Sequence, residues 1–168
     1  EEVLAVQEQG IPYISFPEAI QKFYLENRKS LVVAGTHGKT TTTALLSWVL
    51  HSAERDPGFM VGGWMKNFDG NHAIPKGEFF VSEGDEYDTA FFDKGPKFLH
   101  YSPFASILTG VEFDHADIYR DLDHIKDSFR KFVNIIHPDG FLLTAFSDEH
   151  AKDVLAGASC AVETYGFS

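Results

Sequence analysis

Cysteine is almost absent from the 168-residue chain, in which Cys160 stands alone. A lone thiol excludes an internal disulfide and a cysteine-based zinc cluster. Basic residues are also scarce, with 14 Lys and Arg against 25 Asp and Glu, which gives a net charge of −11. Because a surface this acidic repels the phosphates of nucleic acids and anionic lipids, no general affinity for nucleic acid or for a membrane surface is expected.

Long hydrophobic runs are missing as well. No apolar segment approaches the about 18 residues needed to span a membrane, and no charged-then-apolar signal sequence opens the chain. These absences favour a soluble, cytoplasmic protein. What the chain does have is a hydrophobic content of 43% that includes 16 Phe, enough for a packed and largely aromatic core.

Apolar runs of strand length alternate with segments of helical periodicity, a pattern typical of α/β proteins. The expected strands are residues 31–34, 59–61, 79–82, 105–109 and 141–145. The expected helices are one that begins at the capping box of Ser15 and Glu18, one over residues 39–51 and one over residues 122–136. Residues 66–77, rich in Asn, Gly and Asp, are predicted to form a loop. The predicted fold class is therefore a three-layer αβα arrangement around a mostly parallel sheet.

The inward faces of these helices follow from the positions of their apolar residues. In the first helix the expected stripe is Ala19, Ile20, Phe23 and Tyr24. In the second helix the residues expected to face the core are Ala44, Leu45, Trp48 and Val49. The third helix has the clearest amphipathic pattern, made by Leu122, Ile125, Phe129, Phe132, Val133 and Ile136.

A candidate phosphate loop, Gly35-Thr36-His37-Gly38-Lys39-Thr40, lies directly between the first expected strand and the second expected helix. Glycine allows a backbone to wrap closely around an anion, and the N–H groups of a helix N-terminus attract phosphate. In such a loop Lys39 reaches the outer phosphates and the hydroxyl of Thr40 binds Mg²⁺. The general phosphate-loop pattern has a Gly where this chain has Val33, so the loop is a variant of that pattern.

Two acidic clusters follow further expected strands. The first is Glu83-Gly84-Asp85-Glu86-Tyr87-Asp88, and the second is Glu112-Phe113-Asp114-His115. An exposed acidic turn and a structural histidine are the ordinary interpretations of such residues. Their position at strand ends favours ligand binding instead, because α/β sheets bind ligands at the carboxyl ends of their strands.

Residues 35–42, Gly-Thr-His-Gly-Lys-Thr-Thr-Thr, resemble the phosphate loop of the Mur ligases, which add amino acids or peptides to a UDP-linked muramic acid. The resemblance implies ATP and Mg²⁺ as cofactors. It implies catalytic roles for Lys39, Glu83 and His115, and Mg²⁺ binding by Thr40, Glu83 and His115. The resemblance also implies that the nucleotide is bound by residues of this loop, namely Gly35, Thr36, His37, Gly38, Lys39, Thr40 and Thr41. The family has an Asn where this chain has Gly110.

The resemblance also suggests substrates. Residues 83–94 and 97–101 are similar to family members that join L-alanyl-γ-D-glutamyl-meso-diaminopimelate to UDP-N-acetylmuramate through an acyl phosphate, in recycling of cell-wall peptide. One alternative is another ligase of the same fold, either a member that adds L-alanine to the same sugar nucleotide or a folylpolyglutamate synthase. An alternative of another class is a nucleotide-binding switch module without ligase activity, although the Asn-Lys-x-Asp and Asp-x-x-Gly tetrapeptides of GTPases are absent. The third alternative is a structural domain without catalytic activity, in which the Gly-Lys-Thr sequence occurs by chance.

The resemblance divides the chain into two parts. Residues 1–30 are expected to be the tail of an N-terminal UDP-binding domain and its linker, and residues 31–168 the first part of a central ATP-binding domain. The chain is accordingly expected to be a fragment that does not ligate by itself.

Overall fold

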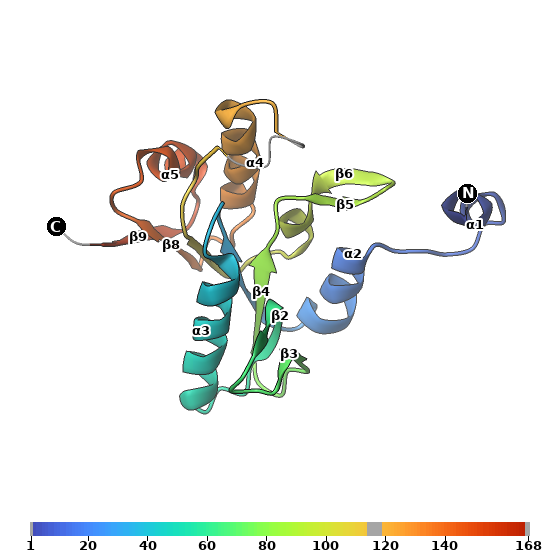
Figure 1. Cartoon of the computed structure of the whole chain (residues 1–168), viewed down its shortest axis with the longest axis horizontal. Coiled ribbons are helices and arrows are strands. Elements are labelled where there is room, and N and C mark those ends of the chain that lie inside the picture. The colour runs from blue at the N-terminus through green and yellow to red at the C-terminus, as the bar shows by residue number, and fades with distance from the viewer. Residues whose placement is uncertain (1, 114–118, 167–168) are drawn as a thin grey trace.

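The computed structural model describes residues 2–113 and 119–166. Its main feature is a seven-stranded sheet in the order β3-β2-β4-β1-β7-β8-β9 (Figure 1). Every neighbouring pair is parallel except β2 and β3, which are antiparallel. The strands of this sheet are β1 (Lys29–Ala34), β2 (Gly58–Met65), β3 (Gly70–Ala73), β4 (Phe79–Gly84), β7 (Ala105–Leu108), β8 (Phe141–Ala145) and β9 (Ala161–Tyr165). A separate hairpin consists of β5 (Asp88–Ala90) and β6 (Asp93–Pro96).

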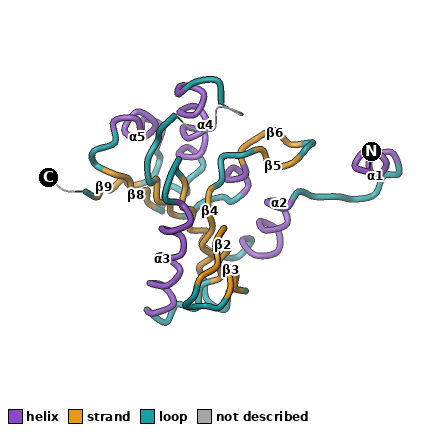
Figure 2. The backbone as a smooth tube through the Cα atoms, viewed as in Figure 1, coloured by secondary structure: helices purple, strands orange, loops and turns teal. Residues whose placement is uncertain are grey.

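Helices lie on both faces of the sheet, as the alternating pattern predicts (Figure 2). The helix α3 (Lys39–Ser52) packs on one face, over β1, β2 and β4. The helices α4 (Leu122–Asn134) and α5 (Glu149–Val154) pack on the other. The remaining helical elements are α1 (Glu2–Glu8), α2 (Phe16–Ile20), the π-helical η1 (Gln21–Leu25), and the 3₁₀ turns η2 (Lys97–His100) and η3 (Leu155–Gly157). The predicted three-layer α/β fold is confirmed.

The larger part of the core lies between the sheet and α4, and it is aromatic. Phe98 stacks against Phe129 and packs against Phe132, with ring centroids 5.9 and 4.9 Å apart, and all three side chains are buried. The amphipathic pattern of residues 122–136 therefore predicts both the helix and the face that it buries. Among the described residues, no helix has the length and apolarity that crossing a membrane requires.

The inward face of α3 differs from the prediction. Of the four residues predicted to face inward, Ala44 packs against the core, beside Leu46 and Leu50. Leu45, Trp48 and Val49 are exposed, whereas Thr43 and Ser47 are fully buried against the sheet. The two buried hydroxyls donate to backbone oxygens one turn earlier, at 2.8 Å each. Because these bonds satisfy the hydroxyls inside the helix, small polar side chains can be buried where the helix approaches the sheet closely.

Two smaller expectations also need correction. Residues 66–77 do not form a continuous loop, because residues 70–73 form β3 and pair with β2. A turn with Asp69 in the left-handed region, at φ 49°, leads into this strand. In the first helical segment Phe23 is exposed and Leu25 is buried instead. Residues 21–25 form a π-helical turn, whose wider i→i+5 spacing moves the inward position along the chain.

The parallel strands bring three segments to the same edge of the sheet. Ala34 at the end of β1 is in register with Gly84 of β4 on one side and with Leu108 of β7 on the other. The candidate phosphate loop, the first acidic cluster and the segment after residue 108 therefore all begin side by side, at the carboxyl edge of three neighbouring strands. This arrangement brings sequence segments more than 70 residues apart to one place.

Candidate functional site

The phosphate loop joins β1 to α3 through two glycines in conformations that other residues rarely adopt. Gly35 has φ 126° and Gly38, the N-cap of α3, has φ 80°. A Cβ atom at Gly35 would clash with the side chain of Thr109 and crowd the backbone of Gly110, whereas one at Gly38 would meet nothing. Gly35 is thus required by both backbone geometry and space, and Gly38 by its left-handed backbone alone.

The neighbouring segment after β7 holds the loop in place. The amide of Thr36 donates to the carbonyl oxygen of Gly110 at 3.0 Å. The hydroxyl of Thr36 accepts from the Glu112 amide at 2.9 Å and lies 3.1 Å from the Glu112 carbonyl oxygen, to which it donates. The hydroxyl of Thr109 donates to the backbone oxygen of His37. These contacts leave little freedom to the first half of the loop.

Lys39 turns back over the loop that precedes it. Its Nζ donates to the carbonyl oxygens of Gly35 and Thr36, at 2.7 and 3.3 Å. It also forms an ion pair with the carboxylate of Glu86, at 2.8 and 3.0 Å. The ammonium thus lies at the mouth of the loop and at the N-terminus of α3, where positive charge and helix N–H groups attract an anion.

Thr40 and Glu83 come together as the sequence predicts. The Thr40 hydroxyl donates to Oε2 of Glu83 at 3.0 Å, and the amide of Gly62 in β2 donates to Oε1. A Cβ atom at Gly62 would lie 3.1 Å from Oε1, which is tighter than ordinary contact. A side chain at Gly62 would therefore displace the Glu83 carboxylate, and Gly62 is not among the predicted site residues. The carboxylate and the hydroxyl form a pair of oxygen ligands of the kind that Mg²⁺ prefers.

Glu86 and Asp148 are two further residues of this edge that the sequence does not single out. Glu86 is buried, and its backbone oxygen accepts from the hydroxyl of Tyr119 at 2.9 Å. Burial, with a smaller contribution from neighbouring carboxylates, raises the pKa of Tyr119 to about 12, so the phenol keeps its proton and donates. Asp148 caps α5 and accepts from the amide of Val111 at 2.7 Å, which ties α5 to the segment that holds the loop.

The remaining residues predicted for the site have different outcomes. His37 is largely exposed, with its Nε2 3.7 Å from a carboxylate oxygen of Glu112. Thr41 is exposed in the first turn of α3. His115, the expected second Mg²⁺ ligand, lies outside the described residues. Within residues 2–113 and 119–166, no group of three His, Cys, Asp or Glu side chains is placed to hold a metal by itself.

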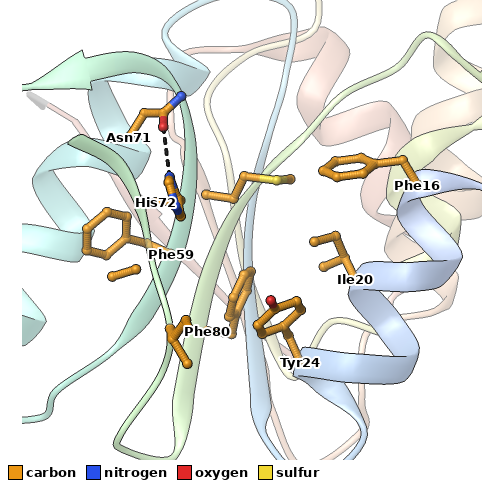
Figure 3. A pocket seen from close by; sticks show the side chains of 10 residues that line it. Phe16, Ile20, Tyr24, Phe59, Asn71, His72 and Phe80 are labelled. Carbon is orange, nitrogen blue, oxygen red and sulfur yellow. Dashed lines mark hydrogen bonds between the residues drawn. The ribbon is translucent and has the colours of Figure 1, made fainter.

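An apolar pocket of about 400 Å³ lies elsewhere, between α2–η1 and the first halves of β2 and β4 (Figure 3). Its lining residues are Phe16, Ile20, Tyr24, Phe59, Met60, Asn71, His72, Ala73, Ile74 and Phe80. Asn71 and His72 provide side-chain polar atoms and are hydrogen bonded to each other at 3.0 Å. Because Phe59 and Phe80 belong to the first halves of their strands, this pocket is separate from the phosphate loop at the carboxyl edge.

The comparisons with known proteins agree on one family. The sequence model described as the Mur ligase middle domain matches residues 33–168. The UDP-N-acetylmuramate–L-alanyl-γ-D-glutamyl-meso-2,6-diaminoheptandioate ligase of Escherichia coli is 45% identical over 92% of this chain and 34% of its own length. The UDP-N-acetylmuramate–L-alanine ligase of Clostridium perfringens is 35% identical over 99% of this chain and 35% of its own length. The chain thus spans about a third of the length of these relatives.

Solved structures give the same result. The crystal structure of the UDP-N-acetylmuramate:L-alanyl-γ-D-glutamyl-meso-diaminopimelate ligase from Neisseria meningitides superposes with a TM-score of 0.92 and 41% identity, covering 98% of this chain and 54% of that chain. The murein peptide ligase from Psychrobacter arcticus superposes with a TM-score of 0.86 at 34% identity, over 96% of this chain and 37% of its own. By sequence and by fold, the chain belongs to the Mur ligase family, and its residues 33–168 match the model of that family's middle domain.

Proposed function

We propose that the chain is the nucleotide-binding part of a murein peptide ligase, which uses ATP to join L-alanyl-γ-D-glutamyl-meso-diaminopimelate to UDP-N-acetylmuramate in recycling of cell-wall peptide. The observation that carries this proposal is that the Lys39 ammonium, paired with Glu86, and the Thr40 hydroxyl, bonded to Glu83, lie at one edge of the sheet. The names and identities of the relatives support the choice of substrates, since two peptide-adding relatives are 45% and 42% identical. The use of ATP and a UDP-linked sugar fits a cytoplasmic enzyme.

The reaction needs an activated carboxylate, because an unactivated carboxylate oxygen is a poor leaving group. In the proposed first step an oxygen of the sugar-linked carboxylate bonds to the γ-phosphorus of ATP while the bond from that phosphorus to ADP breaks. The peptide amine then attacks the acyl carbon, phosphate leaves and the amine loses a proton. The first step brings two anions together, so cationic groups at the site lower its barrier.

The residues of the chain divide these tasks. The loop from Gly35 to Gly38 and the N-terminus of α3 bind the phosphates through backbone N–H groups. Lys39 places its ammonium against the negative charge that develops on the transferred phosphoryl group. Thr40 and Glu83 hold Mg²⁺, which when bound neutralises phosphate charge. Two oxygen ligands suffice for this, because Mg²⁺ usually keeps several waters and binds substrate phosphates as well. His115 is proposed as a ligand of a second Mg²⁺.

The domain assignment belongs to the same proposal. Residues 1–30 would be the tail of the UDP-binding domain, and residues 31–168 the first part of the ATP-binding domain. An apolar groove of about 420 Å³ lies over β1, β7 and β8 on the α3 face. This groove supports the second assignment, because parallel sheets are normally covered by helices on both faces. A part of a ligase that binds only some of the reactants lacks the alignment of reactants that catalysis requires, so the 168-residue chain is proposed not to ligate alone.

A member that adds L-alanine is the second candidate, supported by relatives with up to 36% identity. The test for both uses the full-length ligase with ATP, Mg²⁺ and UDP-N-acetylmuramate, offered either the tripeptide or L-alanine, with the UDP-linked product followed by mass spectrometry. The proposal expects the tripeptide product, and it expects K39A to reduce its formation about 10²–10³-fold. Preferential use of L-alanine would favour the second candidate, and ATP turnover that does not depend on the sugar nucleotide would indicate a switch module.

A further inference from the structure

Glu86 occupies a buried position against the loop lysine. Its side chain is 3% exposed and that of Lys39 is 16% exposed, and the two groups are 2.8 Å apart. A carboxylate is rarely buried unless it is paired, and separating such a pair leaves an uncompensated charge in a poorly solvated place. The position of Glu86 is therefore tied to the presence of Lys39, although 47 residues separate them in the chain.

The hydrogen bonds of the Lys39 ammonium fix the direction in which its third N–H points. An ammonium has three N–H donors. Two of them have short partners, the Gly35 carbonyl oxygen at 2.7 Å and the Glu86 carboxylate at 2.8 Å. The third contact, to the carbonyl oxygen of Thr36, is longer at 3.3 Å and is the easiest to exchange for a better acceptor. With Gly35 and Glu86 as two fixed points, the rotation of the ammonium is restricted and the third N–H is presented to the loop.

Glu86 itself is anchored from two sides. Its backbone oxygen accepts from Tyr119, which precedes α4. The preceding residue, Asp85, pairs with Lys97 at 2.7 Å and accepts from the amide of Tyr87 at 3.1 Å. These contacts hold the turn that carries Glu86 between η2 and the start of α4. The carboxylate is thus a preorganised group rather than a mobile surface side chain.

We propose that Glu86 is a positioning residue that aims the ammonium of Lys39 at the transferred phosphoryl group. This inference rests on the proposed function, in which Lys39 binds the phosphates of ATP. Glu86 is also a negative charge beside a polyanion, so it opposes ground-state binding of the nucleotide while it fixes the geometry needed in the transition state. A residue that acts in this way raises kcat at the expense of nucleotide affinity.

The test uses the full-length ligase and the isosteric substitution E86Q, with E86D as a variant that retains the charge. For E86Q we expect kcat to fall about 10–100-fold, because a misplaced group at the reacting centre can cost about 10²-fold. The dissociation constant for Mg²⁺–ATP, measured by titration calorimetry, should decrease about threefold or more, since one negative charge near the phosphates is removed. E86D should recover part of kcat, and E86Q should have little further effect on kcat in a K39A background.

An E86Q enzyme with wild-type kcat would overturn the inference. An E86Q enzyme that loses kcat and ATP affinity together with its melting temperature would also overturn it, because that result would indicate a structural role only. If E86Q does not fold, E86D provides the test. A wild-type kcat in a folded E86D enzyme would contradict the inference, because the position of the carboxylate would then not matter. A reduced kcat with retained ATP affinity would support the inference. A wild-type protein that fails to bind Mg²⁺–ATP would overturn the proposed function as well, whereas binding that K39A abolishes and E86Q leaves unchanged would overturn this inference alone.

Discussion

The carboxylate of Asp148 joins two structural tasks, which makes its removal informative. Oδ1 accepts from the amides of His150 and Ala151 at 2.9 Å each, and this caps α5. Oδ2 accepts from the amide of Val111 at 2.7 Å, and Val111 is fully buried. Replacing a helix cap by Ala costs about 1 kcal/mol, and a hydrogen bond to a charged group contributes about 1.5–3 kcal/mol. D148A should therefore destabilise the protein by about 3 kcal/mol.

Thermal unfolding followed by circular dichroism checks this value. For a chain of this size 1 kcal/mol corresponds to about 2–4 °C, so D148A should lower the melting temperature by about 6–12 °C. D148N is the matched control: Asn caps helices as well as Asp does, but its amide offers a single oxygen, so only the contact with Val111 should be lost. A melting temperature for D148A within about 2 °C of the unchanged protein would refute the reasoning. A D148N protein as stable as the unchanged one would show that the Val111 contact contributes nothing.

Two further predictions concern the edge of the sheet. G62A should raise the Mg²⁺ concentration that the full-length ligase needs for half-maximal turnover about 10-fold, because the added Cβ would displace the Glu83 carboxylate, 3.1 Å away. The control is G70A, whose added Cβ would meet its nearest atom at 3.8 Å. An unchanged Mg²⁺ titration for G62A would contradict the prediction. Burial raises the pKa of Tyr119 to about 12 from an unfolded value of 10.0, so the unfolded chain releases this proton first and stability should fall as pH rises from about 10 towards 12. Urea midpoints measured across this pH range should fall less steeply for Y119F than for the unchanged protein. Part of the pH dependence should remain in Y119F, because burial also raises the pKa of Tyr101 to about 12. An equal slope of midpoint against pH in the two proteins would contradict the prediction.

The sequence predicted what depends on local pattern. Residues 122–136 show the helical period clearly, and the structure buries the face that the period marks. The capping box of Ser15 and Glu18 is present with both of its hydrogen bonds. The strands at 31–34, 79–82 and 141–145 were predicted because buried parallel strands are short apolar runs. Each of these signals lies within a few consecutive residues.

What the sequence did not predict depends on contacts between distant segments. The prediction for the inward face of α3 was right for Ala44 but wrong for apolar residues such as Trp48, which are exposed, whereas Thr43 is buried with its hydroxyl satisfied inside the helix. The hairpin of β5 and β6 was not predicted because each strand is too short to show a period of two. Glu86 was one of four carboxylates in its cluster, and only the fold shows that it pairs with Lys39. Gly62 has no side chain that could indicate a role, and only the fold shows that its amide donates to the Glu83 carboxylate.

The loop from Gly35 to Thr40 is proposed to bind the phosphates of ATP, with Mg²⁺ held by Thr40 and Glu83. The most direct measurement is a crystal structure of the full-length ligase with Mg²⁺ and a non-hydrolysable ATP analogue. We expect the outer phosphates to lie inside the loop, an N–H of Lys39 to donate to one of them, and Mg²⁺ to lie about 2.0–2.1 Å from the Thr40 hydroxyl and a Glu83 carboxylate oxygen. Phosphates bound outside this loop, or a metal that contacts neither of these residues, would contradict it.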